Sequence, residues 1–342
     1  MTAPLRLAIV GCGWVAGYVA WFARLNRRIR LVACCDRTLA EAERFAARHR
    51  IPHAYADYPA MLEQEALDAV YLAVPHDLHL EMTRAAIEAR RHVFLEKPLA
   101  GLLAEAREIA QIAGGAPVRV GVNYQNRYDP GCYALAMAIR RGNLGKPYYG
   151  RCNLPWQRGM DYFEQGSWRG QLARAGGGTL LTQGSHALDV LLWALGGRPH
   201  QALGMVAQQK FDQVEVEDLA MGTVEMENGT LVQISSSMVA NPEQAMTMEV
   251  YGERGTALYT NRPWPHVRFR GVQIKRTRLP VGGIHPLQRS LEAFRAWIVE
   301  DRPYLTPVDE ALPVLATIDA IYRSAQSGQR ELVQLDVNPH LV

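Results

Sequence analysis

The sequence predicts an α/β protein with two domains: a doubly wound parallel sheet over residues 1–125, and an α+β domain with a large, mainly antiparallel open sheet over residues 126–342. The chain has 342 residues, which is enough for about two domains. Buried strands alternate with amphipathic helices in the first third, and long alternating strands prevail later. These three observations together predict the fold class.

The first domain is expected to contain five strands, each a short apolar run. They span residues 5–11, 29–36, 67–75, 92–96 and 118–124. Helical patterns separate them, and one begins at Thr38, where Glu41 completes a capping box. Strands that are apolar along their whole length are buried on both faces, which is typical of a parallel sheet covered by helices.

The hydrophobic pattern of the sequence changes in the second domain. A helix is expected over 130–142, and alternating strands are expected from 201 to 279. Asn228-Gly229 between two of these strands predicts a tight hairpin. Apolar residues at helical spacing in 287–298 and 311–322 predict two closing helices.

Composition narrows the class of protein. Charged residues make up 21% and the net charge of +3 is scattered, which argues against a nucleic-acid partner. The five cysteines show no ligand spacing and are odd in number, so we expect reduced thiols, no metal site and a cytoplasmic location. Glycines interrupt the uncharged run 7–23, which favours a strand, turn and helix over a signal peptide or membrane span.

A glycine-rich turn follows the first strand. Gly11-Cys12-Gly13-Trp14-Val15-Ala16 fits G-x-G-x-x-[GA] between a predicted strand and a predicted helix. The first glycine permits the tight turn, and the second lets backbone N–H groups approach a pyrophosphate at the helix N-terminus. A turn that binds nothing is the alternative, but the strand, the helix and a downstream acid are all present. We therefore predict a Rossmann domain that binds a dinucleotide.

Asp36 ends the second strand about 20 residues after the turn, where a carboxylate hydrogen-bonds the ribose hydroxyls of NAD. Arg37 is suited to a 2′-phosphate, but Asp36 would repel that phosphate. The sequence therefore favours NAD, with NADP as the alternative.

Lys97, in the stretch "FLEKPLA", follows the carboxyl end of the strand 92–96. In doubly wound sheets ligands lie at this edge, which also carries Gly11 and Asp36. Pro98 restricts the backbone of Lys97 and permits a cis peptide bond between the two. A lysine beside a nicotinamide orients a substrate hydroxyl and stabilises oxyanion charge, and partial burial should lower its pKa. A surface lysine in a loop is the alternative.

A polar stripe supports the catalytic interpretation. Within the largely apolar run 176–197, polar residues occur at i, i+3, i+4 and i+7: Thr182, Ser185, His186 and Asp189. Buried polar groups are costly unless paired or used. A histidine inside such a stripe, after three glycines, is a candidate general base, although a lone core histidine is the commoner case.

These residues match a known family. The chain resembles the Gfo/Idh/MocA oxidoreductases, named after glucose–fructose oxidoreductase, inositol dehydrogenase and a rhizopine-catabolism protein. The resemblance covers essentially the whole chain and rests on "AIVGCGWVAG", "AVPHDLH", "EKPLA", "VGVNYQNRYDPG", "GNLGKP", "GSWRGQLARAGGGTLLTQGSHALD" and "DEALPVLATIDAIYRSAQSGQ". Thr182 stands where many members have aspartate. Threonine followed by Gln-Gly-x-His is similar to the sugar and nucleotide-sugar 3-dehydrogenase branch.

The resemblance implies NAD(P)-dependent hydride transfer between the nicotinamide and a ring carbinol of a sugar, sugar derivative or cyclitol. Lys97 and His186 are implied as the catalytic pair, His186 taking the hydroxyl proton and Lys97 orienting the hydroxyl and sharing the proton transfer. A homodimer or homotetramer through the C-terminal sheet is also implied.

The expected site residues come from the motifs, the strand ends and the resemblance. For the cofactor they are Gly11, Cys12, Gly13, Trp14, Val15, Asp36, Arg37, Val74, Pro75, His76, His79, Glu96, Lys97, Trp168 and Arg169. For the substrate they are Lys97, Asn123, Arg127, Arg158, Tyr162, Thr182 and His186, with Gln125 also in the cleft. Packing at the domain junction is the alternative for Trp168, and hydrogen bonding at the hinge is the alternative for Asn123, Gln125 and Arg127.

Two other functions occur on this scaffold. One is a non-catalytic NAD-binding regulator, which the presence of Lys97 together with His186 argues against. The other is an NAD-dependent glycosidase that oxidises, eliminates, adds water and reduces back. It would turn over without net NADH.

Overall fold

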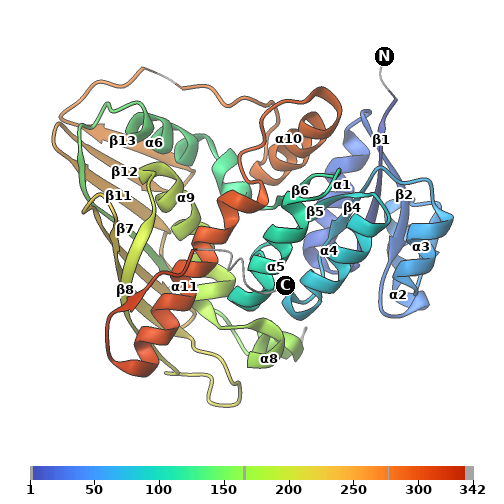
Figure 1. The fold of residues 1–342 in the computed structure, drawn as a ribbon, viewed down its shortest axis with the longest axis horizontal. Helices are drawn as coiled ribbons and strands as arrows, with labels where there is room; N and C mark the ends of the chain where they lie inside the picture. The colour runs from blue at the N-terminus through green and yellow to red at the C-terminus, as the bar shows by residue number, and fades with distance from the viewer. Residues whose placement is uncertain (1–2, 165–166, 276, 336–342) are drawn as a thin grey trace.

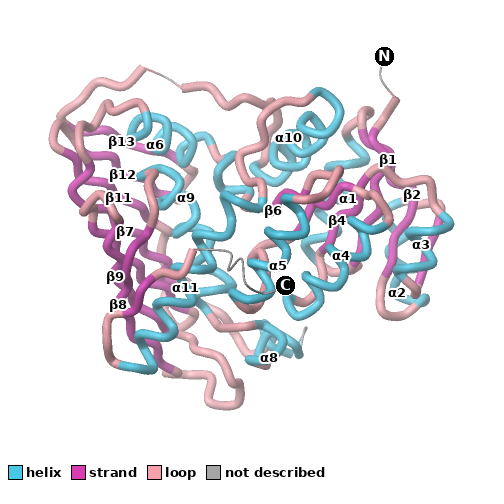
Figure 2. The backbone as a smooth tube through the Cα atoms, viewed as in Figure 1, coloured by secondary structure: helices cyan, strands magenta, loops and turns pink. Residues whose placement is uncertain are grey.

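The computed structural model describes residues 3–164, 167–275 and 277–335 (Figure 1). It contains two sheets, and Figure 2 shows their strands in two groups with most of the helices between and around them. The sheet at the right of the view belongs to the N-terminal domain, and the larger sheet at the left belongs to the C-terminal domain. The predicted fold class is confirmed.

The N-terminal sheet has six strands in the order β3-β2-β1-β4-β5-β6, and every neighbouring pair is parallel. The strands are β1 (Leu5–Val10), β2 (Ile29–Cys35), β3 (His53–Tyr55), β4 (Ala69–Leu72), β5 (His92–Leu95) and β6 (Val120–Val122). The five predicted strands are present. The edge strand β3 was missed because three half-exposed residues carry no apolar run.

Helices cover both faces of this sheet. They are α1 (Trp14–Leu25), α2 (Leu39–His49), α3 (Tyr58–Gln64), α4 (His79–Glu88) and α5 (Leu103–Gly114). At the start of α2, the Thr38 hydroxyl accepts a hydrogen bond from the Glu41 N–H at 3.3 Å, so the predicted cap is confirmed. No described helix is both long and apolar enough to cross a membrane.

The C-terminal sheet has eight strands in the order β13-β12-β11-β7-β10-β9-β8-β14. They are β7 (Pro147–Pro155), β8 (Pro199–Ala207), β9 (Leu219–Met226), β10 (Leu231–Ser237), β11 (Thr247–Gly252), β12 (Thr256–Thr260), β13 (His266–Arg270) and β14 (Glu331–Leu332). All neighbours are antiparallel except β7 and β10. The predicted hairpin joins β9 to β10, with Gly229 at φ 81°.

The strand region ends earlier than predicted. Gly271 has φ 78° and turns the chain away after β13, so residues 271–275 and 277–279 form no strand. This segment instead leads back to the N-terminal domain through α10 (Pro286–Glu300).

One face of the C-terminal sheet is covered by α6 (Pro130–Arg140), α9 (Ser185–Leu195) and α11 (Val308–Ser327), and the other face is open (Figure 1). Helix α11 also packs against α5, so one apolar core continues from one domain to the other. A second core joins α10 to the N-terminal sheet, where the Phe294 ring stacks on Phe94 with centroids 4.8 Å apart. A division at residue 125 stays a prediction. Whatever the boundary, α10 packs with the first domain.

Candidate active site

The carboxyl ends of the parallel strands bring the predicted cofactor residues to one edge of the sheet. The glycine turn follows β1, Asp36 follows β2, Val74 and Pro75 follow β4, and Lys97 follows β5. Because all six strands run the same way, these segments meet at the same edge.

The glycine turn has room for a ligand. Gly11 has φ 85°, and a Cβ there would lie 2.3 Å from the Ala73 carbonyl oxygen, so only glycine fits. A Cβ at Gly13 would meet no atom within 4 Å, so the space beside this backbone is open. Gly13 caps α1 with no side-chain hydrogen bond, which leaves the N–H groups of the first turn to an anion. This cradle fits a dinucleotide pyrophosphate.

Asp36 faces the same turn. Its carboxylate accepts hydrogen bonds from the Cys12 N–H at 2.6 Å and the Arg37 N–H at 2.7 Å. The side chain of Arg37 is exposed, and Trp14 at the start of α1 is 80% exposed. The Asp36 carboxylate therefore lies beside the turn, where it can accept hydrogen bonds from ribose hydroxyls.

The two histidines of the predicted cofactor loop are buried. The His76 Nδ1 lies 2.7 Å from the Ala175 carbonyl, and its ring meets the Trp168 ring edge-on with centroids 4.7 Å apart. His79 lies between carbonyls, with Nδ1 3.1 Å from the Pro98 oxygen and Nε2 3.2 Å from the Val74 oxygen. The His79 ring thus lies between the loops after β4 and β5, and its expected cofactor contact stays a prediction.

Glu96 and Asn123 form a buried network. The Glu96 carboxylate accepts hydrogen bonds from the Tyr71 hydroxyl and, at 2.6 Å, from the Asn123 amide, whose oxygen accepts from Ser290 at 2.8 Å. Asn123 is fully buried and Glu96 is 8% exposed. Both side chains join β5 and β6 to α10, and their expected contacts with cofactor and substrate stay predictions.

Arg127 is also a structural residue. Its guanidinium is 1% exposed and pairs with Asp189 at 2.8 Å and with Glu310 at 2.8 Å. It donates a further hydrogen bond to the Leu305 carbonyl at 2.6 Å. The N–H groups of Arg127 are thus bonded within the protein, and its expected substrate contact stays a prediction. It connects η2 (Gln125–Tyr128) to α9 and α11.

Lys97 reaches across to the second domain. Its Nζ donates a hydrogen bond to the Thr182 carbonyl at 2.6 Å, and the Lys97–Pro98 peptide is cis. Burial lowers the pKa of Lys97 to about 8; Glu96 opposes this effect and the charge of Arg169 adds to it. The nitrogen is therefore held in place and changes its charge near neutral pH.

His186 stands at the end of a π-helical turn (Leu180–Gly184) that precedes α9. Its Nδ1 is buried without a hydrogen-bond partner among the described residues. Burial, and next the charge of Lys97, place the pKa of His186 well below its usual range. The ring is therefore neutral and has an unpaired nitrogen. The Thr182 hydroxyl donates a hydrogen bond to the Gly178 carbonyl at 2.7 Å. The Thr182 side chain is therefore bonded within the turn, and its carbonyl binds Lys97.

Gln183 was missed by sequence reasoning. It is 4% exposed, lies between Thr182 and His186, and neither of its amide atoms has a partner in the described part of the chain. An unpaired buried amide costs free energy unless something binds it. The sequence did show a polar residue, Gln183, in an apolar run. It lies next to the polar stripe but does not follow the helical spacing of that stripe.

A cavity of about 530 Å³ opens beside His186. This volume falls within the range of about 300–1,000 Å³ that is usual for ligand sites. Its lining comes from η2, α6, α9, β12, α10 and the loops around them, including the loop after β7: Gln125, Asn126, Asp129, Pro130, Trp156, His186, Met246, Tyr259, Asn261, Pro265, Ile284, His285, Pro286 and Arg289. Of the expected substrate residues, His186 and Gln125 line it.

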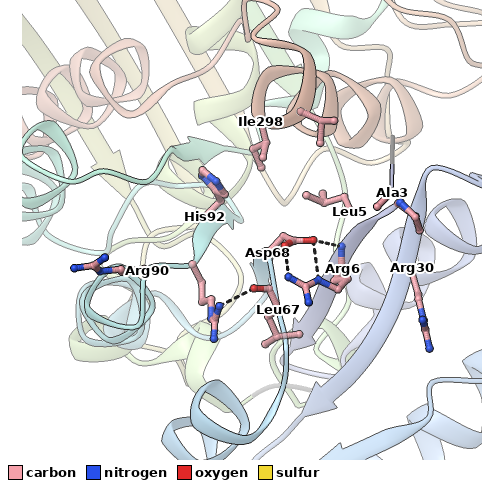
Figure 3. Close-up of a pocket in the computed structure, with 12 residues that line it drawn as sticks. Ala3, Leu5, Arg6, Arg30, Leu67, Asp68, Arg90, His92 and Ile298 are labelled. Atoms are coloured by element: carbon pink, nitrogen blue, oxygen red, sulfur yellow. Dashed lines mark hydrogen bonds and ion pairs between the residues drawn. The ribbon is translucent and has the colours of Figure 1, made fainter. Parts of the chain in front are cut away.

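Another cavity, of about 620 Å³, lies at the amino ends of the strands, away from this edge (Figure 3). Four arginines line it, but its acid Asp68 already binds Arg6 with an N–O distance of 2.6 Å. Figure 3 shows Arg30 and Arg90 directed away from Asp68. This cavity brings no catalytic group to the cofactor edge.

The remaining expected residues form a cation–aromatic ladder between the cavity and the cofactor loop. Arg158 lies over Trp156 at 5.3 Å and over Tyr162 at 5.9 Å. Arg169 lies over Tyr162 at 5.3 Å and over Trp168 at 4.9 Å, and Trp168 contacts His76. Trp156 belongs to the cavity wall. The ladder therefore links the cavity to the cofactor edge.

The described part of the chain contains no cluster of three or more His, Cys, Asp or Glu side chains suited to a metal ion. The absence of a metal from the reaction stays a prediction. The five cysteines are free thiols, and all but Cys12 are buried.

The chain is similar to known proteins. The D-glucoside 3-dehydrogenase of Escherichia coli (strain K12) is 26% identical over 96% of this chain and 97% of its own. The 1,5-anhydro-D-fructose reductase of Ensifer adhaerens is 29% identical over 83% of this chain and 85% of its own. The WlbA dehydrogenase of Bordetella pertussis, solved with NADH and UDP-GlcNAcA, superposes with a TM-score of 0.85 at 27% identity and covers 97% of this chain and 100% of its own.

Two family models match the two halves of the chain. The oxidoreductase family with an NAD-binding Rossmann fold matches residues 5–124, and the GFO/IDH/MocA C-terminal domain matches residues 133–258. The chain therefore belongs to the Gfo/Idh/MocA family of NAD-binding oxidoreductases.

Proposed function

We propose that this protein transfers a hydride between NAD and a ring carbinol of a sugar, sugar derivative or cyclitol. The observation that carries the proposal is the pairing of Lys97 with His186. The Lys97 nitrogen is fixed at the cofactor edge by the Thr182 carbonyl, and the neutral His186 ring lines a ligand-sized cavity. One group can orient a hydroxyl and the other can accept its proton.

In the proposed reaction, the carbinol R₂CH–OH and NAD⁺ give the ketone R₂C=O, NADH and a proton. The nicotinamide, when bound, supplies the hydride acceptor. Lys97 orients the hydroxyl, and the Lys97–His186 pair takes the O–H proton. Burial, and next the charge of Lys97, lower the pKa of His186, so the His186 ring is neutral while Lys97 is protonated.

The cofactor residues we propose are those that remain at the open edge: the turn 11–15, Asp36, Arg37, Val74 and Pro75. Trp168 and Arg169 are proposed to lie beside the nicotinamide, because Arg169 is close enough to Lys97 for its charge to lower the lysine pKa. Arg158 and Tyr162 are proposed as substrate contacts behind Trp156. The carboxylate of Asp36 supports NAD over NADP.

The relatives support a sugar-like substrate, because their names describe an anhydrofructose reductase and a glucoside 3-dehydrogenase, and the WlbA structure holds a nucleotide sugar. The cavity supports it independently: aromatic Trp156 and Tyr259 line it, and aromatic faces pack on sugar rings.

The test is a titration of the purified protein with NAD and NADP, followed by a panel of sugars, uronic acids, inositols and nucleotide sugars. We expect at least one compound to reduce bound or free NAD. Tight NAD binding with no oxidation across the panel would contradict the proposal. Cleavage of an aryl glycoside without net NADH would then indicate the redox-neutral glycosidase, and no turnover of any kind would indicate the regulator.

We also propose a homodimer or homotetramer formed through the open face of the C-terminal sheet. Large apolar side chains are exposed on adjacent strands of this face: Tyr149, Leu203, Met205, Met221 and Leu231. The strand register places Met205 beside Met221 and Leu231 beside Tyr149. Contiguous apolar surface of this kind is typical of protein–protein interfaces.

The free thiols support a reducing, cytoplasmic location.

A further inference from the structure

The cavity beside His186 is lined by a cation that forms no ion pair with the described residues. Among the described residues that line it, Arg289 is the one arginine or lysine. It comes from α10 and is half-buried, and no carboxylate lies within ion-pair distance of it in the part of the chain that the structure describes. The other arginines near this end of the molecule are paired: Arg127 with Asp189, and Arg158 with Glu243.

The guanidinium of Arg289 is held in place by main-chain carbonyls. Nε donates to Gly283 at 3.0 Å, and one terminal nitrogen, Nη1, donates to Tyr128 at 3.2 Å. The other terminal nitrogen, Nη2, has no hydrogen-bond acceptor among the described residues. A guanidinium fixed on one side presents its remaining N–H groups in the geometry that suits a carboxylate or phosphate.

The nearest acid does not neutralise it. Asp129 also lines the cavity and interacts with Arg289 through charge alone. One oxygen of its carboxylate caps α6 and accepts hydrogen bonds from Gly131 at 2.9 Å and Cys132 at 3.0 Å. Burial lowers the pKa of Arg289, and the charge of Asp129 opposes this effect without forming an ion pair. An anionic ligand would add a direct ion pair.

The polar groups around Arg289 fit a ligand with one anionic end and one sugar end. Trp156 and Tyr259 provide aromatic surface in the same cavity, and Asn261 uses its amide oxygen on the Met246 N–H at 2.9 Å, which leaves its NH₂ for a ligand. His186 lies in the same wall. A carbinol at His186 and an anion at Arg289 can therefore belong to one molecule.

We propose that the substrate carries a carboxylate or phosphate and that Arg289 binds it, so that Arg289 selects anionic sugars over neutral ones. This inference rests on the proposed function and narrows its substrate class. The named relatives do not decide the matter, because they include enzymes of neutral sugars as well as a structure with a nucleotide sugar acid.

The experiment compares matched substrates that differ only in the anion: D-glucose, D-glucuronate, D-glucose 1-phosphate and a UDP-linked glucose. Kinetics are measured with NAD for the wild type, Arg289→Gln, Arg289→Lys and Arg254→Gln. Arg254 is the matched control, because it is an exposed arginine that also donates to a main-chain carbonyl, that of Gly142, but lies outside the cavity. NADH binding by each variant shows that it is folded.

We expect the wild type to prefer an anionic substrate. Arg289→Gln should raise KM for that substrate about ten- to a hundredfold with a smaller change in kcat, because a charge-assisted hydrogen bond present before and during reaction is lost. The KM of Arg289→Lys should lie between those of the wild type and Arg289→Gln. Arg254→Gln should have the KM and kcat of the wild type. Preference for the uronate indicates a carboxylate, and preference for the sugar phosphate or the UDP-sugar indicates a phosphate.

The inference would be overturned if the wild type had equal kcat/KM for neutral and anionic sugars, or if Arg289→Gln lost kcat/KM equally for both. The proposed function would still stand. If no compound of the wider panel of sugars, uronic acids, inositols and nucleotide sugars is oxidised, the proposed function fails, and the inference is tested by calorimetry on the NAD-loaded protein. Binding of D-glucuronate or D-glucose 1-phosphate but not D-glucose, lost in Arg289→Gln, supports the anion site, and absence of that difference overturns it.

Discussion

Among single residues, Lys97 has the charge on which the proposed proton transfer depends. Burial lowers its pKa to about 8, so the Lys97–His186 pair holds one proton near neutral pH and loses it in mildly alkaline solution. A second proton is costly for the pair, because the charged lysine lowers the pKa of the histidine. Oxidation of a carbinol delivers a proton to this pair, whereas reduction of a ketone removes one.

The resulting pH dependence has a defined sign. kcat/KM for oxidation should rise as the pH increases toward about 8 and level off above it, because the deprotonated pair accepts the hydroxyl proton more readily. In Lys97→Arg the residual activity should lack this break, because arginine stays charged throughout. A wild-type profile that is flat across this range, or a break that survives in Lys97→Arg, would count against the proton role of the pair.

Sequence reasoning found the residues whose local context is unusual and missed those whose role depends on distant partners. Lys97 precedes a proline at a strand end, and His186 lies in a polar stripe, so both carry a local signal. Arg127 looks like any arginine after a strand. Only the folded chain brings it to Asp189, 62 residues away, and buries both.

At the scale of elements, the strand ends of the parallel sheet determine where the cofactor residues meet. The alternation of apolar runs and helices was sufficient to predict the sheet, the glycine turn and Asp36 at one edge. The π-helical turn 180–184 was not predicted, because the sequence there has the spacing of an ordinary helix. That turn presents the Thr182 carbonyl to Lys97.

The carboxylate after β2 should govern cofactor choice. Asp36→Ala should weaken NAD binding about ten- to a hundredfold and leave NADP binding nearly unchanged, because only the unphosphorylated ribose hydrogen-bonds the acid. Fluorescence titration with both cofactors measures this. Asp57→Ala is the matched control, since Asp57 also accepts from a backbone N–H, that of Ala60, but caps α3. An equal loss for NAD and NADP would refute the assignment.

The ion pair between η2 and α9 should be essential to stability. Arg127→Met leaves Asp189 buried without its partner and should lower the free energy of unfolding by about 3–5 kcal/mol. Arg84→Met, which breaks an exposed pair with Glu108, should cost less than about 1 kcal/mol. Urea unfolding of both variants tests this. If the double variant Arg127→Met/Asp189→Leu recovers none of the loss, the uncompensated charge is not its cause.

At the scale of the whole molecule, α10 and α11 fasten the domains to each other. Both helices were predicted as elements of the second domain, yet α10 packs on β5 and α1, and α11 packs on α5. Their apolar stripes were visible in the sequence, but a stripe does not identify the surface that it covers. The same is true of the open sheet face. The alternation of polar and apolar residues predicts that one face is exposed, but it does not identify what binds there.

The open face should form the subunit interface. Met205→Lys combined with Leu231→Lys should dissociate the oligomer, because two charges would be buried in an apolar contact. Sedimentation equilibrium measures the mass of the variant. Leu39→Lys, at an exposed leucine of α2, is the control and should leave the mass unchanged. A wild-type protein that sediments as a monomer would contradict the proposed assembly.

We propose that Lys97 takes part in hydride transfer and does not serve the fold alone. The most direct measurement is the NADH formed by Lys97→Ala in a single turnover, with NAD bound at saturation and a substrate that the wild type oxidises. We predict cofactor affinity close to that of the wild type and no detectable NADH. Oxidation at a rate near that of the wild type would contradict the account.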